Sequence, residues 1–504
     1  MTPVQAYQEL VQRSKEIAYL GTAQAVLSWD QEVNMPRNGA PWRAEMQAYL
    51  SGQLHRKATD PAINDLLAAV EESDLVSDPL SDVAVNVREW RREYDRTTKL
   101  PAEFVERFTR VVVISQQVWA EARAKADFSI FAPHLREIIE LTKAKADYLG
   151  YDDQPYDALL DGFEPGEKTE NVKRLFAALR EELVPFLQEI MASSTQPDPS
   201  IVEDRDYPIE RQRILGEIVS AAFGLNYRSA RLDVSTHPFS TNLGPGDQRI
   251  TTRFDPRNFN DSFFSILHET GHALYEQNLP QEHFGTPRGE SVSLGIHESQ
   301  SRTWENLVGR SGAFWAYGFP LARQFFPAAL ADVSLEDFYF AVNAVKPGFI
   351  RVEADEVTYN LHVMLRFEIE QAIINEGLPV EDIPATWNAL FKAYLGLDVP
   401  DDSKGVLQDV HWSHGMIGYF PTYALGNLYG AQFFAQAKKD IPDLERAFAR
   451  GDFLPLLDWL RQNIHQHGMR YRAYDLVQVV TGEPLSHKPL MDHLRAKYGE
   501  LYNL

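Results

Sequence analysis

The sequence predicts a mainly α-helical protein with one small β-sheet. Two observations indicate this fold class: apolar residues recur three and four positions apart along most of the chain, and one central stretch alternates instead. None of the 504 residues is cysteine. Without cysteine there is no disulfide framework, no thiolate metal ligand and no cysteine nucleophile. A packed core must hold the fold, and an apolar fraction of 44% is sufficient to build one.

Seven stretches have helical periodicity, with charged residues between the apolar positions. They span residues 3–30, 39–56, 82–97, 102–126, 130–149, 167–193 and 208–224. Helix starts are expected at Pro101 and Pro133 and helix ends at Gly150 and Gly224, because proline suits a first turn and glycine suits the residue after the last. Residues 193–208 are predicted as a loop, which is the candidate boundary between two lobes.

Residues 229–254 break the helical pattern, since they are rich in Thr, Ser, Gly and Pro. The alternation within residues 247–254 favours a small sheet or a hairpin. A helix is predicted directly afterwards at 260–277, with Asn260 or Asp261 as its cap. Two irregular segments then interrupt the helices of the second half, a loop at 399–407 and an aromatic, glycine-containing stretch at 411–430.

The chain is strongly acidic, with 72 acidic residues against 49 basic ones and a net charge of −23. Such a surface repels nucleic acid and anionic membranes, so neither is expected as a partner. Residues 1–20 lack the basic segment and apolar run of a signal peptide, and no window is apolar for long enough to span a bilayer. We therefore expect a soluble, cytoplasmic protein.

The helix predicted at 260–277 contains the sequence His-Glu-Thr-Gly-His at residues 268–272. Residues four apart share one face of a helix, so His268 and His272 can direct ring nitrogens at one metal ion at about 2.0–2.1 Å. Glu269 lies too far round the helix to bind the same ion, but it is well placed to activate a water molecule there. This spacing is typical of a zinc site with a glutamate base.

A catalytic zinc needs a third protein ligand and an open position. The metzincin pattern would require glycine at 275 and histidine at 278, but Tyr275 and Asn278 stand there, which excludes that class. A glutamate from a following helix is the alternative. Glu298 is the candidate, because it lies on a segment with helical spacing that a glycine turn can fold back; Glu290 and Glu305 compete with it.

The partners of the two histidines are left open. A metal-binding histidine normally donates its second N–H to an acceptor. In many enzymes with these ligands the acceptor is an acid one turn after the ligand glutamate, but Arg302 occupies that position. Asp355 and backbone carbonyl groups are the remaining candidates.

Six short motifs follow one another between residues 237 and 412. They are His237-Pro238-Phe239, Asp247-Gln248-Arg249-Ile250-Thr251, residues 268–272, His297-Glu298-Ser299-Gln300, Ile350-Arg351-Val352-Glu353-Ala354-Asp355, and Gly405-Val406-Leu407-Gln408-Asp409-Val410-His411-Trp412. In this set and order the chain resembles the Taq carboxypeptidase family of zinc metallocarboxypeptidases, over residues 1–504 as a single catalytic domain.

The resemblance implies four residue roles: His268, His272 and Glu298 as metal ligands and Glu269 as the general base. It implies one Zn²⁺ per chain, for which Co²⁺ can substitute, and a homodimer. It also implies a two-lobed helical fold with a deep active-site cleft, similar to angiotensin-converting enzyme and neurolysin. The family removes single residues from the free C-terminus of peptides, with broad side-chain preference and poor tolerance of C-terminal proline.

A metallocarboxypeptidase also needs a cation that holds the terminal carboxylate of the substrate, and the fork of an arginine suits both oxygens. Arg351 is the candidate. A structural salt bridge from Arg351 to Asp355, four residues on, is an equally open interpretation. Arg249 and Lys404 are weaker alternatives.

Donors are needed for the oxyanion that forms during attack on the carbonyl. His411, Tyr419 and Tyr423 are the candidates, although each could instead pack in the core. His237 and Gln300 are candidates for a rim that closes the cleft to longer chains.

Two other functions are weighed against this one. A related helical zinc endopeptidase or aminopeptidase would share the metal chemistry, but an aminopeptidase needs carboxylates that hold the free amine of its substrate. A catalytically silent binding protein could retain the same residues as a relic.

Overall fold

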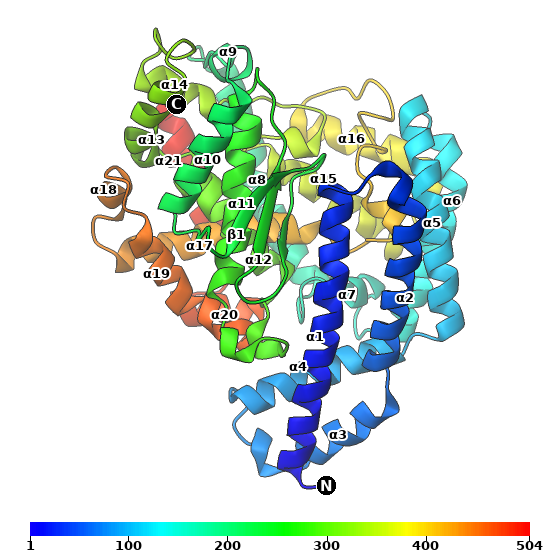
Figure 1. The fold of residues 1–504 in the computed structure, drawn as a ribbon. Coiled ribbons are helices and arrows are strands. Elements are labelled where there is room, and N and C mark those ends of the chain that lie inside the picture. The colour runs from blue at the N-terminus through cyan, green and yellow to red at the C-terminus, as the bar shows by residue number, and fades with distance from the viewer.

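The computed structural model describes residues 1–504, and it confirms a mainly helical protein with one small sheet (Figure 1). The helices before the sheet are α1 (Pro3–Val33), α2 (Ala40–Ala58), α3 (Pro61–Glu71), α4 (Asp82–Thr98), α5 (Ala102–Lys125), α6 (Phe128–Leu149), α7 (Pro155–Leu160), α8 (Thr169–Ala192), α9 (Ser200–Glu203) and α10 (Ile209–Ala222). All seven predicted helices of this half are present.

Local signals explain where these helices start. α1 begins with a capping box, in which Thr2 and Gln5 bond each other's backbone N–H groups, and proline occupies its first turn. α6 does not begin at Pro133, as predicted, but at Phe128, because the Asp127 side chain accepts a hydrogen bond from the N–H of Ser129. The short α9 interrupts the predicted loop at 193–208, and α3 is not among the predicted helices.

The sheet has three strands, β1 (Ala230–Val234), β2 (Ser240–Asn242) and β3 (Gln248–Thr252). Their order is β1-β3-β2, with β3 parallel to β1 and antiparallel to β2. The predicted sheet is therefore confirmed, although it is more than one hairpin. β3 is the central strand and is buried at Ile250, Thr251 and Thr252, where it lies against the helix that follows.

Helices dominate again after the sheet. They are α11 (Phe259–Asn278), α12 (Leu294–Arg302), α13 (Gly312–Phe325), α14 (Leu335–Val342), α15 (Tyr359–Ile374), α16 (Ile383–Leu395), α17 (Pro421–Asp440), α18 (Leu444–Phe448), α19 (Leu454–Asn463), α20 (Ala473–Thr481) and α21 (Lys488–Tyr502). A π-helical segment, η5 (Thr303–Val308), continues α12, and a short 3₁₀ turn, η8 (His411–His414), precedes α17. The cap of α11 is Asn258, not Asn260 or Asp261 as predicted.

Two glycines let α11, α12 and α17 approach one another closely. A Cβ atom at Gly271 of α11 would lie 2.5 Å from the carbonyl oxygen of Gln300 on α12. A Cβ atom at Gly426 of α17 would lie 2.6 Å from Cγ of Glu298. Because real Cβ contacts are not this short, both positions require glycine for the observed packing. The helix pair α11–α12 is thus held as one unit with α17 behind it.

The N-terminal helices form a separate layer. Residues of α1, α3 and α4 pack around a small core of seven buried apolar residues, apart from the principal core of 100 that runs through the rest of the molecule. Figure 1 shows α1 passing across the front of the molecule beside the sheet, and the Trp29 ring lies under the guanidinium groups of Arg249 and Arg231. No helix is both long and apolar enough to cross a membrane.

Candidate metal centre

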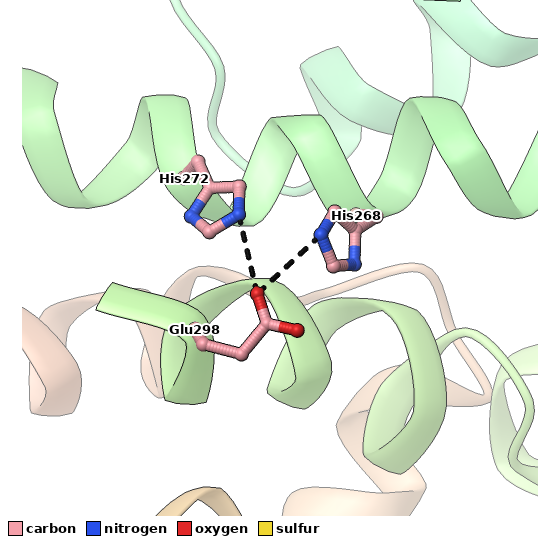
Figure 2. A group of neighbouring side chains, drawn as sticks. All are labelled: His268, His272 and Glu298. Atoms are coloured by element: carbon pink, nitrogen blue, oxygen red, sulfur yellow. Dashed lines mark ion pairs between the residues drawn. The ribbon is translucent and has the colours of Figure 1, made fainter. Parts of the chain in front are cut away.

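Two neighbouring helices bring three potential metal ligands together. His268 and His272 lie one turn apart on α11, and Glu298 reaches up between them from α12 (Figure 2). Oε2 of Glu298 lies 3.6 Å from Nε2 of His268 and 3.5 Å from Nε2 of His272. These separations are long for hydrogen bonds. They match the spacing of about 3.4 Å that ligand atoms have around one tetrahedral ion when each is bound at about 2.1 Å.

The donor set fits a zinc ion. All three ligand atoms lie within 4.8 Å of one another, and no hydrogen bond reaches Nε2 of either histidine. Two imidazoles and one carboxylate are the ligands of one class of catalytic zinc site, which keeps a fourth position open. The sequence expectation of His268, His272 and Glu298 is therefore compatible with the geometry.

Glu269 lies beside this group on α11 and is almost fully buried. Burial raises the pKa of its carboxyl group to about 7, with the neighbouring His268 acting in the opposite direction. A carboxyl group with a pKa near neutrality can take a proton and release it again at the same pH. This is the property required of a general base that later acts as an acid.

Arg302 holds the other oxygen of Glu298. Its Nε donates to Oε1 of Glu298 at 2.8 Å, and its Nη1 donates to Oε2 of Glu305 at 3.1 Å. Burial alone would raise the pKa of Glu298, but the Arg302 guanidinium and the histidines outweigh it and hold that pKa well below its ordinary value. Glu298 is consequently an ionised carboxylate with Oε2 directed at the histidines.

Glu305 is the hydrogen-bond partner of His268 that the sequence leaves unassigned. Its Oε2 lies 2.8 Å from Nδ1 of His268. Glu305 therefore does not compete as a ligand but bonds the ring nitrogen of His268 that faces away from the other ligand candidates. Glu290 also lies outside the group of converging ligand atoms. Asp355, one of the candidate acceptors, is engaged elsewhere, because it accepts hydrogen bonds from the backbone N–H groups of Val357 and Thr358, just before α15. The acceptor for His268 is thus an acid two turns after Glu298, in the π-helical segment η5. In many enzymes with these ligands it is an acid one turn after the ligand glutamate.

Arg351 does not form the salt bridge with Asp355 that the sequence allowed. Its Nη2 donates to Oδ1 of Asp409 at 2.9 Å, and its Nη1 donates to the hydroxyl of Tyr359 at 3.0 Å. Arg366 shares the same acid, with Nε 2.7 Å from Oδ2 of Asp409. Two guanidinium groups and one carboxylate leave one positive charge unmatched within this buried trio.

A cluster of rings connects Arg351 to His411, Tyr419 and Tyr423. The Arg351 guanidinium lies 4.7 Å above the Tyr423 ring, and the Tyr423 hydroxyl is 3.2 Å from Nε2 of His411. Burial lowers the pKa of His411 to about 3, so this ring is neutral. Burial also raises the pKa values of Tyr419 and Tyr423, so both hydroxyls keep their protons and can donate them.

The structure corrects one of the remaining site predictions. Gln300 is buried, with its carbonyl 2.9 Å from Nε2 of His465 and its amide donating to Ser299, so it lines no rim. His237 is exposed on the loop after β1. Arg249 is paired with Asp247, and Lys404 is exposed beside a surface hollow.

Comparisons with known proteins identify the family to which this chain belongs. The model of the family described as carboxypeptidase Taq (M32) metallopeptidase matches residues 9–498. The chain belongs to the M32 family of metallopeptidases. Thermostable carboxypeptidase 1 of Thermus thermophilus is 50% identical over the full length of both chains, and carboxypeptidase 1 of Bacillus subtilis is 39% identical over 97% of each. The crystal structure of the M32 carboxypeptidase from Deinococcus radiodurans has a TM-score of 0.96 and 42% identity, with 99% of this chain and 100% of that chain covered.

The M32 family is a family of carboxypeptidases that require a metal, and the enzyme class expected from the sequence is confirmed. Membership in the M32 family does not by itself identify the residues that bond the site residues from outside. His297 bonds His272, Glu276 bonds His297, and Arg366 bonds Asp409. None of these three roles was identified from the sequence. Two of them carried a local signal, since Glu276 stands four residues after His272 and His297 precedes Glu298.

Proposed function

We propose that this M32 enzyme is a zinc carboxypeptidase that removes single residues from the free C-terminus of peptides. His268, His272 and Glu298 would hold one Zn²⁺, for which Co²⁺ can substitute, and Glu269 would be the general base. The observation that carries the proposal is the convergence of two unbonded imidazole nitrogens and one carboxylate oxygen at the spacing of a tetrahedral site.

The bound zinc would supply Lewis-acid polarisation of the scissile carbonyl and would make the attacking water more acidic. Glu269 takes the proton from that water and delivers it to the leaving amine, and its pKa of about 7 suits both steps. Tyr423, Tyr419 and His411 supply hydrogen-bond donors for the oxyanion that develops on the carbonyl oxygen. This role is supported by their ionisation states, because His411 is uncharged and both tyrosines keep their hydroxyl protons.

Arg351 would bind the terminal carboxylate of the peptide. Arg351 and Arg366 together carry one positive charge more than Asp409 neutralises, and a carboxylate would complete the balance. Tyr359 links this group to the metal centre, because its hydroxyl accepts from Arg351 while the Arg302 guanidinium lies 4.2 Å above its ring. His237 remains the candidate for the rim, and Arg249 and Lys404 remain the alternative cations for the terminal carboxylate.

Further properties belong to the same proposal. We expect broad side-chain preference, with poor cleavage of peptides that end in proline. We also expect residues 1–504 to act as one catalytic domain, with two lobes around a deep cleft, in a cytoplasmic homodimer. The mass of the protein in solution, measured by light scattering, would test the dimer directly.

The alternative zinc peptidases differ in the charge that they need in the substrate cleft. An aminopeptidase would need a carboxylate surplus to hold the free amine, whereas the buried trio of Arg351, Arg366 and Asp409 has a cationic surplus. An endopeptidase would need neither. A silent binding protein would not need Glu269.

Blocked peptides distinguish these functions. We expect an N-acetylated peptide to lose residues one at a time from its C-terminus in the presence of zinc, as followed by mass spectrometry. A peptide of the same sequence with a free N-terminal amine and a C-terminal amide should resist, and a chelator should stop the reaction. Trimming of only the amidated peptide would indicate an aminopeptidase, internal cleavage would indicate an endopeptidase, and no cleavage would indicate a silent protein.

A further inference from the structure

His272 is one end of a chain of hydrogen-bonding side chains that the proposed function does not use. Its Nδ1 lies 2.6 Å from Nδ1 of His297, and Nε2 of His297 lies 2.8 Å from Oε1 of Glu276. The other oxygen of Glu276 accepts a hydrogen bond at 2.6 Å from the amide of Asn242. The chain thus runs from a metal-ligand candidate on α11, through α12 and back to α11, and ends at strand β2.

The short contact between the two imidazoles fixes where the protons lie. Two Nδ1 atoms 2.6 Å apart must share one proton, because two lone pairs would repel and two N–H groups would clash. The carboxylate of Glu276 only accepts, so Nε2 of His297 carries a proton and donates it to Glu276. Nδ1 of His297 is then the acceptor of the shared proton, which Nδ1 of His272 donates. This leaves the lone pair of His272 on Nε2, which faces Glu298 and the metal position.

The ring of His297 is held in place by packing as well. It lies 5.2 Å from the ring of Tyr275, centroid to centroid. The opposite neighbour of Tyr275 is His465, at 5.0 Å, and Nε2 of His465 is bonded to Gln300. His465 is therefore a buried histidine with the same aromatic neighbour but with no hydrogen bond to a metal-ligand candidate.

We propose that His297 and Glu276 are positioning residues that set the tautomer and the orientation of His272, so that its Nε2 presents a lone pair to the metal. This inference rests on the proposed zinc site and extends it. His268 is oriented in one step by the carboxylate of Glu305, whereas His272 is oriented in two steps with an imidazole between it and the acid. Metal affinity should therefore depend on residues that do not contact the metal.

Zinc affinity, measured by competition with a chromophoric chelator, tests the chain. We expect His297→Leu to bind zinc about 10–100-fold more weakly than the wild type, as is usual when a partner of a ligand is lost. His297→Gln should recover most of this loss, because its amide oxygen can accept from His272 while its NH₂ group donates to Glu276. The matched control, His465→Leu, should bind zinc like the wild type.

Glu276→Gln separates charge from hydrogen bonding, since the amide can still accept from His297 but carries no charge. We expect its affinity to lie between those of His297→Leu and the wild type. Equal zinc affinity in His297→Leu and the wild type would overturn the inference. So would an equal loss in His465→Leu, which would assign the effect to packing around Tyr275. A wild-type protein that binds no zinc would instead overturn the proposed zinc site.

A second measurement needs no variant that might fail to fold. In the full-length, metal-free protein with ¹⁵N-labelled histidine rings, nitrogen chemical shifts distinguish protonated from unprotonated ring nitrogens. We expect Nδ1 of His272 and Nε2 of His297 to be protonated and Nδ1 of His297 to be unprotonated, with His297→Gln used for assignment. A proton on Nδ1 of His297 would reverse the chain and refute it.

Discussion

The metal centre and the cluster around Glu356 are both groups of buried charges, but their polar atoms are used differently. Glu356 follows the Ile-Arg-x-x-Ala-Asp motif and accepts hydrogen bonds from Lys497 at 2.7 Å, His493 at 2.9 Å and Tyr498 at 3.0 Å. All three donors lie on α21, so the cluster attaches the C-terminal helix to the start of α15. In the metal centre, by contrast, Nε2 of both histidines makes no hydrogen bond.

This difference indicates how to recognise a functional site among buried charges. A structural cluster satisfies its own donors and acceptors, because each unpaired buried polar atom costs stability. A binding site keeps some atoms unpaired for a ligand and holds them by bonds at their far ends, as Glu305 and Arg302 do here. Substitutions within each of the two groups should therefore affect chemistry, stability and metal affinity separately.

The largest effect is expected from Glu269→Gln. The amide cannot take a proton from the attacking water, so turnover should fall by about 10²–10⁴-fold. Zinc should remain bound at wild-type affinity, because Glu269 is not among the three converging ligands. Steady-state kinetics on an N-acetylated peptide and metal analysis of the same sample measure both outcomes; turnover at the wild-type rate would disprove the assigned role.

The sequence predicted the elements of this molecule well, because their signals are local. Helical periodicity and the glycines after helices depend on neighbours within one or two turns. The sheet was predicted from composition, but its β1-β3-β2 order depends on β3 being buried between two partners, which a local pattern does not contain. Asn258 was missed as the cap of α11 because Asn258, Asn260 and Asp261 lie within four residues and each has a side chain that can serve as a cap.

The site was predictable to the same degree. The spacing of residues 268–272 predicted two ligand candidates on one face, and the third came from a nearby helix. The partners of Arg351 and His268 were not predictable, since Asp409 is 58 residues from Arg351 and Glu305 is 37 residues from His268. Such contacts are set by how α11 packs against η5, and by how the segment before α15 packs against the segment before η8. Gln300 was misassigned because its motif neighbour Glu298 faces the metal centre, whereas Gln300 faces His465.

The Glu356 cluster should affect stability and not chemistry. Glu356→Gln removes the carboxylate and leaves the buried ammonium of Lys497 without its partner, which should cost about 3–5 kcal/mol of the free energy of unfolding. Denaturant titration followed by circular dichroism measures this loss, while kcat of the folded fraction should stay at the wild-type value. The double variant Glu356→Gln, Lys497→Met should recover much of the stability, because no unpaired charge is then buried. A loss as large in the double variant would contradict the ion-pair explanation.

A smaller effect is expected from Glu305→Gln in the metal centre. This change removes the carboxylate that orients His268 and leaves Arg302 with Glu298 as its main partner. We expect zinc affinity to fall by about 10–100-fold, with little change in the unfolding of the metal-free protein. Chelator competition measures the affinity, and Glu290→Gln is the matched control, since Glu290 bonds neither histidine. Equal affinities in the two variants would show that Glu305 does not support the ligand.

The smallest effect is expected in the pH dependence of the unfolding free energy, to which the Glu356 cluster contributes. Burial alone would raise the pKa of Glu356, but Lys497 and His493 outweigh it and hold that pKa far below the ordinary value of 4.5. A carboxylate with a lowered pKa in the folded state stabilises the protein fully above about pH 4.5 and loses this contribution as the pH falls toward its folded pKa.

The difference in unfolding free energy between the wild type and Glu356→Gln should therefore shrink below about pH 4.5, by up to about 1.4 kcal/mol per pH unit. Carboxylates outside the cluster titrate in both proteins and cancel in this difference, so the slope reports on the cluster of Glu356, His493 and Lys497. Unfolding titrations at about pH 5.5, 4.5 and 3.5, across the ordinary carboxyl range, would measure it. A difference that is constant over this range would mean that Glu356 has an ordinary pKa in the folded protein. The contrast between the Glu356 cluster and the candidate metal centre would then lose its electrostatic basis.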